Sequence, residues 1–309
     1  MIKSIRDQYN MAFTEADYQK FVHACQDKYH KTIEFKVCET PIFIPADFKS
    51  KVLAAGEEII DLICNPAFKQ TSKKAIPENC FVPGEEGNPA FIALDFGICI
   101  DANGELIPQL IEMQGFASLY AWQHELGKQY KAHFPIPDTV DHLFNGLDER
   151  SYIDLLKKII IGNHQPENVI ILEIEPDKQK TWIDFYLTRS MLDIEPVCIS
   201  KIIKEGKDLF YMKNGVKTKI HRIYDRLIFD ELQARKDLLL QWNLTDEVNV
   251  EWVCHPNWFF RISKYTLPFI KSKYVPETIF LNELKSIPED LENWVLKPLY
   301  SFAGHGVKF

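Results

Sequence analysis

The sequence predicts an α/β protein, α+β when the whole chain is considered, and three observations lead to this class. Residues 1–75 follow a helical pattern, residues 90–113 have the pattern of a β-hairpin, and from about residue 150 strands alternate with helices. Such alternation is typical of a parallel sheet covered by helices. We therefore expect a parallel α/β domain accompanied by a helical N-terminal region and a hairpin.

The N-terminal region, residues 1–87, is predicted to be mainly helical. Thr14 is a suitable N-cap for a helix whose apolar residues recur at 18, 21, 22 and 25. Residues 47–64 repeat the pattern, with apolar side chains from Val52 to Ile63 on one face. Pro41 and Pro45 separate these two helices.

Residues 88–135 change to strand character. A strand is expected over 90–100, an Asn103-Gly104 hairpin turn follows it, and a return strand covers 106–113. Residues 119–130 are predicted to form a helix. We treat this hairpin and helix as one region.

Residues 136–245 carry the alternating pattern. The expected elements, in order, are a helix at 151–161, a buried strand at 168–173, a helix at 181–192, a strand at 195–200, a lysine- and glycine-containing hairpin near 206–216, a strand at 222–226 and a helix at 229–237. The last region, residues 246–309, is rich in aromatic residues early. It ends with a predicted buried strand at 294–296.

Composition excludes several classes of protein. The chain has 309 residues and a net charge of -8, which argues against a general nucleic-acid or membrane-surface binder. No apolar stretch approaches the ~18 residues of a membrane helix, and the charged N-terminus lacks the apolar segment of a signal peptide. The seven cysteines form no Cys-x-x-Cys pair, so we expect reduced thiols, no zinc site and a cytoplasmic location.

The predicted hairpin carries oxygen-bearing side chains in a suggestive arrangement. Glu112 and Gln114 lie on one face of the second strand, and the hairpin brings Asp95 of the first strand close to them. Two carboxylates and an amide oxygen suit Mg²⁺ that also contacts phosphate groups. The competing interpretation is a solvated hairpin face, which the hairpin by itself favours.

A second candidate site lies at the C-terminal end. Lys297 follows the apolar run 294–296, and residues 301–306 form a loop of small residues with glycines at 304 and 306. An ammonium group and glycine backbone N–H groups can together hold a polyphosphate. The order of residues is not that of a Walker loop, and an ordinary hairpin turn is the alternative.

Taken together, these elements resemble the circularly permuted ATP-grasp family, which includes glutathionylspermidine synthase-like proteins. Asp95 followed by Glu112-x-Gln114 is similar to the family's magnesium motif, and Lys297 with residues 301–306 resembles its lysine strand and phosphate loop. The metal motif precedes the loop, as in the permuted group. Residues 223–226 (Ile-Tyr-Asp-Arg) and the Asn257…Ser-Lys264 segment resemble further family elements, so the likeness spans roughly 88–309.

The resemblance implies an ATP-grasp-like fold. Its expected parts are a helical region at 1–87, the metal-motif hairpin and helix of the ATP-grasp core at 88–135, a pre-ATP-grasp parallel α/β domain at 136–245, and the start of the nucleotide-binding lobe at 246–309. Because a glycine loop needs a following strand, we expect this lobe to be incomplete and the chain to be cut short.

The resemblance also implies an ATP- and Mg²⁺-dependent carboxylate–amine ligase that acts through an acyl phosphate on a small molecule or peptide. Asp95, Glu112 and Gln114 are the implied metal ligands, and Arg226 is the implied group for the substrate carboxylate or acyl phosphate, with Arg222 a weaker candidate. The implied ATP-binding residues are Lys264, Lys297, Ser301, Phe302, Ala303, Gly304, His305 and Gly306.

Alternatives remain open for several of these residues. Arg226 could form a structural ion pair with Asp225 or Asp230, and Lys264 could be a surface lysine. Gln114 replaces the family's asparagine, and the glycine loop is thin. These departures motivate a second hypothesis, a catalytically inactive nucleotide-binding or interaction protein of the same fold.

Overall fold

The computed structural model describes residues 1–300 and 306–309. Its helices are α1 (Lys3–Ala12), α2 (Glu15–Gln26), α3 (Ala46–Cys64), α4 (Pro66–Ser72), α5 (Tyr120–His133), α6 (Glu149–Ile160), α7 (Trp182–Leu192), α8 (Phe229–Ala234) and α9 (Asn257–Arg261). Its strands are β1 (Ala93–Ile100), β2 (Leu106–Gln114), β3 (Val169–Glu173), β4 (Glu195–Cys198), β5 (Ile203–Glu205), β6 (Asp208–Lys213), β7 (Val216–Ile220), β8 (Arg222–Asp225) and β9 (Glu251–Val253).

The chain divides into two compact units. The sheet unit comprises Met1–Pro45 and Ser118–Val253, and the hairpin unit comprises Ala46–Ala117 and Cys254–Phe309. The hairpin β1–β2 and helix α5, which follow each other in sequence, therefore lie in different units. The mixed α/β class predicted from the sequence is confirmed.

A parallel sheet forms the centre of the sheet unit. Its strand order is β4-β3-β8-β9, and every residue of β3 is buried. A continuous apolar run such as Val169–Leu172 is what a strand covered on both faces requires. The predicted lysine- and glycine-containing hairpin is also present, as the antiparallel sheet β5-β6-β7.

Three helices pack one on another outward from this sheet. Helix α7 contacts β4, α5 packs on α7, and α2 packs on α5. Aromatic side chains fill the helical layer, with Phe21, Trp122 and Trp182 almost fully buried. The predicted N-cap is confirmed, because the Thr14 hydroxyl accepts a hydrogen bond from the Asp17 N–H at 3.1 Å.

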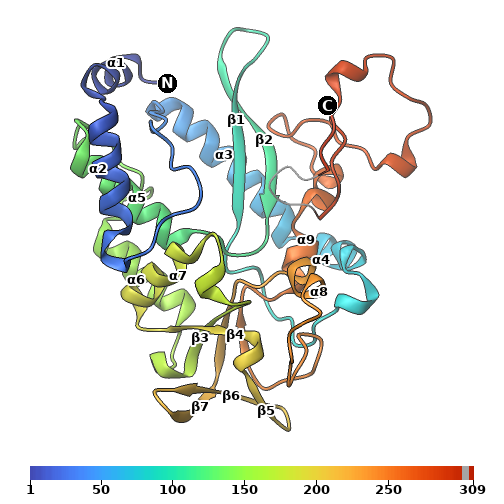
Figure 1. Cartoon of the computed structure of the whole chain (residues 1–309). Helices are drawn as coiled ribbons and strands as arrows, with labels where there is room; N and C mark the ends of the chain where they lie inside the picture. The colour runs from blue at the N-terminus through green and yellow to red at the C-terminus, as the bar shows by residue number, and fades with distance from the viewer. Residues whose placement is uncertain (301–305) are drawn as a thin grey trace. The chain divides into compact units, whose positions relative to one another are not determined.

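The hairpin unit is built on β1, β2 and α3, which Figure 1 shows running beside one another. Ile59 and Ile63 of α3 pack with Leu110 and Met113 of β2 in one apolar cluster. The predicted turn is present: the Asp101 carboxylate accepts from the N–H groups of Asn103 and Glu105, both at 2.9 Å, and Gly104 has a φ of 82°.

One expectation from the sequence is wrong. Residues 294–296 do not form a buried strand: Val295 and Leu296 are 42% and 46% exposed, and the segment makes only an isolated antiparallel bridge from Leu296 to Lys308. Three apolar residues indicate a strand only when neighbouring strands are available to cover them. In the part of the chain that the structure describes, no helix is long and apolar enough to cross a membrane.

Candidate functional site

A β-bulge positions the candidate metal ligands. Asp95 pairs with Glu112 and Phe96 pairs with Leu110, so Ile111 is an extra residue in β2. The bulge lets Leu110 and Met113 both face the buried core while Glu112 lies on the opposite face, directly across from Asp95. From Glu112 to Gln114 the strand keeps the alternation that the sequence predicts, and the bulge interrupts it only between Leu110 and Glu112.

The predicted trio of oxygen ligands comes together on this face. Gln114 pairs with Ala93, two residue pairs along the ladder from Asp95 and Glu112, and its Nε2 lies 3.5 Å from Glu112 Oε1. The pKa of Asp95 is raised, first by partial desolvation and then by the negative charge of Glu112. A bound cation beside Asp95 would favour its ionised form.

This donor set fits Mg²⁺ only with the amide included. Among residues 1–300 and 306–309, no group of three or more His, Cys, Asp and Glu side chains could hold a metal ion. The Gln114 carbonyl oxygen is therefore needed beside the two carboxylates, and turning it towards Asp95 and Glu112 requires rotation of the amide.

Lys264 reaches the same face from the segment after α9. It begins the 3₁₀ helix η7 (Lys264–Phe269), is 7% exposed, and places its Nζ 3.1 Å from Glu112 Oε1. The alternative of a surface lysine is therefore wrong, because the ammonium is buried against a carboxylate.

Gly115 allows the close approach behind this contact. Its N–H donates to the Ile262 carbonyl at 3.0 Å, and a Cβ at position 115 would meet the Trp258 carbonyl oxygen at 2.5 Å. A residue without a side chain is therefore required at position 115, directly after Gln114. Its partner Ile262 lies two residues before Lys264 on the facing segment.

Lys297 also comes to the bulge. Its Nζ donates to the Ile111 carbonyl at 2.8 Å, one residue from Glu112. Burial lowers the pKa of Lys297, the Glu112 charge opposes this, and the Lys264 charge adds to it. The two predicted phosphate-binding lysines thus lie near one carboxylate in the structure.

Most of the predicted phosphate loop lies outside the described residues, namely Ser301, Phe302, Ala303, Gly304 and His305. Gly306 is described and has a φ of 75°, a conformation that favours glycine. Leu296 and Lys308 exchange two backbone hydrogen bonds, both of 2.9 Å, and so form an antiparallel bridge.

A large apolar cavity of about 970 Å³ opens beside the two lysines. Lys264 and Lys297 line it together with apolar side chains that include Val275, Phe280 and Leu296. A volume near the upper end of small-molecule pockets, with a mostly apolar lining, suits a small molecule with a large apolar part.

The segment before Lys264 has a structural role. His255 Nδ1 accepts from the Asn257 N–H at 3.2 Å while Nε2 lies 3.1 Å from the Pro83 carbonyl, which requires the neutral ring with its proton on Nε2. Burial lowers the pKa of His255 to about 4. Arg261 stacks on Trp258 at 4.1 Å and pairs with Glu85. These residues anchor the segment that presents Lys264.

Arg226 lies in the sheet unit, directly after β8. Its buried guanidinium pairs with Asp184 of α7, rather than with Asp225 or Asp230, and rests on the Phe185 ring at 4.9 Å. Its Nε is buried and has no hydrogen-bond partner among residues 1–300 and 306–309. The role of Arg226 towards a substrate stays a prediction. Arg222 instead pairs with Glu251 and donates to the carbonyls of Ile159 and Ile160, which is a structural role.

Two carboxyl groups lie next to Arg226: sequence reasoning did not single out Glu173, and it considered Asp225 only as an ion-pair partner of Arg226. Glu173 ends β3 and Asp225 ends β8, the strands between which the order of connections reverses. Burial raises the pKa of Glu173 to about 8 and that of Asp225 well above its ordinary value. The carboxyl ends of strands at such a switch point are where α/β sheets bind ligands. A carboxylate ending an otherwise apolar strand was the available signal.

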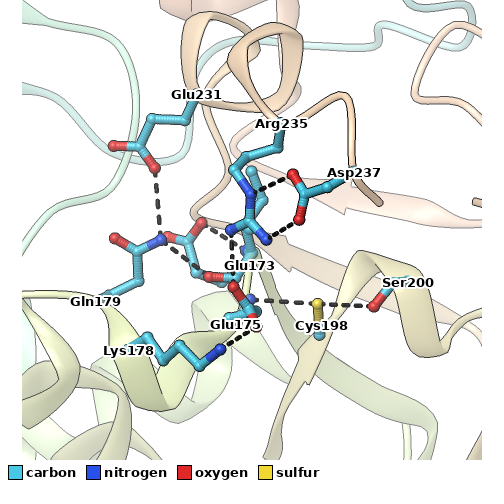
Figure 2. A network of polar contacts seen from close by, with 10 residues as sticks. Glu173, Glu175, Lys178, Gln179, Cys198, Ser200, Glu231, Arg235 and Asp237 are labelled. Atoms are coloured by element: carbon cyan, nitrogen blue, oxygen red, sulfur yellow. Dashed lines mark hydrogen bonds and ion pairs between the residues drawn. The ribbon is translucent and has the colours of Figure 1, made fainter. Parts of the chain in front are cut away.

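Around Glu173, this edge carries a polar network (Figure 2). Arg235 bridges Glu175 and Asp237 at 2.7 Å each, and the Gln179 amide donates to the Ile174 carbonyl at 2.9 Å. The Cys198 thiol at the end of β4 lies 3.1 Å from the Ser200 hydroxyl. The loops after β3 and β4 and the segment after α8 are thereby fixed at the carboxyl edge.

Comparison with known proteins adds a likeness of fold. No family model and no curated protein matches the chain. A solved structure that is similar is that of a glutathione synthetase-like effector from Globodera pallida in its apo form, with a TM-score of 0.53 and 10% identity over 85% of this chain and 68% of that one. At this identity the likeness concerns the fold alone, and it is consistent with the ATP-grasp-like fold expected from the sequence.

Proposed function

We propose that this chain binds ATP and Mg²⁺ in its hairpin unit and acts as a ligase that joins a carboxylate to an amine. One observation carries the proposal: Asp95, Glu112 and Gln114 gather on one face of the hairpin, with Lys264 and Lys297 beside them at an apolar cavity. Oxygen ligands, ammonium groups and an apolar wall complement a metal ion, a triphosphate and a purine base, respectively.

Each residue has a definite task in this proposal. Asp95, Glu112 and the Gln114 carbonyl oxygen would hold Mg²⁺, which when bound neutralises charge on the β- and γ-phosphates. Lys264 and Lys297 would bind phosphate oxygens, and the burial of Lys264 and partial burial of Lys297 strengthen these interactions because less water screens them. The resemblance assigns phosphate binding to residues 301–306 as well, of which 301–305 lie outside the described residues.

The reaction class follows from the same resemblance. The γ-phosphoryl group passes to a carboxylate oxygen of a small molecule or peptide, ADP leaves, and an amine then attacks the acyl carbon and displaces phosphate. The protein's contribution is positioning and neutralisation of the transferred charge. Arg226 is assigned to the substrate carboxylate, for which its Nε offers a donor.

A second candidate function is nucleotide binding without turnover. The orientation of the Gln114 amide favours it, because the nitrogen rather than the oxygen faces Glu112. A longer side chain than asparagine also shifts the third ligand outward. This candidate predicts binding of ATP without release of phosphate.

The first test is thermal unfolding of the chain with a non-hydrolysable ATP analogue and Mg²⁺. Ligand at about 100 times its dissociation constant should stabilise the fold by about 2.7 kcal/mol. Asp95→Ala and Lys297→Ala should abolish the shift, whereas Lys271→Ala, an exposed lysine outside the cavity lining, should preserve it. A wild-type protein that shows no shift would contradict nucleotide binding.

The second test separates the two candidates. ATP-dependent phosphate release is measured with panels of carboxylates and amines. Release that requires both a carboxylate and an amine supports the ligase, while binding with no release under any combination supports the inactive alternative.

A further inference from the structure

Lys264 forms an ion pair with Glu112, a carboxylate that the proposed metal ion would need as a ligand. Its Nζ lies 3.1 Å from Glu112 Oε1, and Glu112 is the direct cross-strand neighbour of Asp95. Two adjacent carboxylates on one hairpin face require compensating positive charge, and in this structure an ammonium from the chain supplies it. The position of this ammonium therefore bears on how a metal ion enters.

The Lys264 side chain borders two cavities within the hairpin unit. Lys264 lines a small pocket that includes Glu112 and Gln114, and it also lines the 970 Å³ cavity shared with Lys297. A lysine ammonium on its flexible four-carbon stem can exchange a carboxylate for a phosphate oxygen without movement of the backbone.

Lys297 differs in the partner it uses. Its ammonium donates to the neutral carbonyl of Ile111 at 2.8 Å, whereas that of Lys264 contacts a carboxylate. A metal ion at Asp95 and Glu112 would therefore compete with Lys264 for a ligand atom and would leave the hydrogen bond of Lys297 in place. This difference makes Lys297 the matched control.

We propose that Lys264 is a built-in counter-ion that holds the Glu112 carboxylate until a divalent cation arrives and then transfers to the nucleotide phosphates. The proposal rests on the function proposed above. A metal ion arriving alone must displace a buried ammonium and leave it without its carboxylate, which is unfavourable. A nucleotide arriving with the metal gives the ammonium a phosphate partner.

Metal and nucleotide therefore bind cooperatively, and Lys264 is a positioning residue for this coupling as well as a phosphate ligand. Coupling of this kind is reciprocal: the factor by which nucleotide strengthens metal binding equals the factor by which metal strengthens nucleotide binding. Removing the ammonium should have effects of opposite sign on the two ligands, which a lysine serving only as a phosphate ligand would not show.

The test is isothermal titration of the chain with Mg²⁺ alone and with a non-hydrolysable ATP analogue, with and without Mg²⁺. Lys264→Met should bind Mg²⁺ alone about tenfold more tightly than wild type and should bind the nucleotide more weakly. Lys297→Met should weaken nucleotide binding and should tighten the binding of Mg²⁺ alone less than Lys264→Met does, because the Lys297 ammonium feels the Glu112 charge but hydrogen-bonds a neutral carbonyl. Comparison between variants cancels the chelation of the metal by nucleotide in solution.

Several results would overturn the proposal. If Lys264→Met and Lys264→Gln both bind Mg²⁺ alone no more tightly than wild type while still binding nucleotide, Lys264 is not a competing counter-ion. A crystal structure of the wild-type complex with Mg²⁺ and the ATP analogue provides a readout free of variants, and a Lys264 ammonium still on Glu112 there would overturn it as well. A wild-type chain that binds neither Mg²⁺ nor the nucleotide would overturn the proposed function as well. Failure of the function can thus be told apart from failure of the counter-ion proposal alone.

Discussion

The buried carboxyl of Glu173 should make the stability of this protein fall as the pH rises. Glu173 is 5% exposed, and burial raises its pKa from 4.5 to about 8, although a hydrogen bond from the Ile174 N–H and the Arg226 charge both act in the opposite direction. The folded protein thus keeps a proton that the unfolded chain releases above about pH 4.5. Because the unfolded state then binds fewer protons, the free energy of unfolding decreases through this interval.

The magnitude follows from the width of the interval. At about 1.4 kcal/mol per pH unit, the range from 4.5 to about 8 gives an upper value of about 5 kcal/mol. Glu173→Gln removes the titration and keeps an oxygen for the Ile174 N–H, which now donates to Glu173 Oε1 at 2.7 Å. The variant should therefore gain stability relative to wild type as the pH rises from about 4.5 to 8, and the gain should stay constant above that range.

The assay is urea unfolding of both proteins at half-unit steps from pH 4 to pH 9. Glu175→Gln is the matched control, because hydrogen bonds from Lys178 and Arg235 lower the pKa of Glu175. That variant should lose stability relative to wild type at high pH and approach it as the pH falls. Parallel curves for wild type and Glu173→Gln across the whole range would refute the reasoning.

Three further predictions concern the hairpin unit. Gly115→Ala should cost about 1–3 kcal/mol of stability and weaken nucleotide binding, because the new Cβ must displace the Trp258 carbonyl. Urea unfolding and nucleotide titration would check this, and an unchanged unfolding midpoint would contradict it. Arg261→Met should cost about 3–5 kcal/mol by leaving Glu85 unpaired, measured by urea unfolding, and a loss below about 1 kcal/mol would show that the pair is unimportant. Because the pKa of His255 is lowered to about 4, its contribution to stability should be present above about pH 6.5 and be lost as the pH falls towards 4. His255→Gln should flatten the dependence of the free energy of unfolding on pH in this range. An equal slope in both proteins would exclude His255 as the cause of that dependence.

Part of the candidate site could be predicted from the local sequence pattern. Strand alternation and the Asn103-Gly104 turn predicted the hairpin, and its pairing brings Asp95 and Glu112 together. The bulge at Ile111 had no local signal, and it breaks the alternation between Leu110 and Glu112 so that Leu110 and Met113 are both buried. The proximity of Lys264 and Lys297 to Glu112 rests on contacts between segments more than 150 residues apart, which only the family resemblance suggested.

The sequence by itself determined the elements whose formation depends on neighbouring residues. These include the Thr14 helix start, the buried β3 strand and the alternation of strands and helices that produces the parallel sheet. Only the tertiary structure decided the partners of charged groups: Arg226 with Asp184, Lys264 with Glu112, and Glu173 buried at the edge of its sheet. The physical reason is that periodicity reports which face of an element is apolar, whereas an ion pair or a desolvated carboxyl depends on which distant segment covers that face.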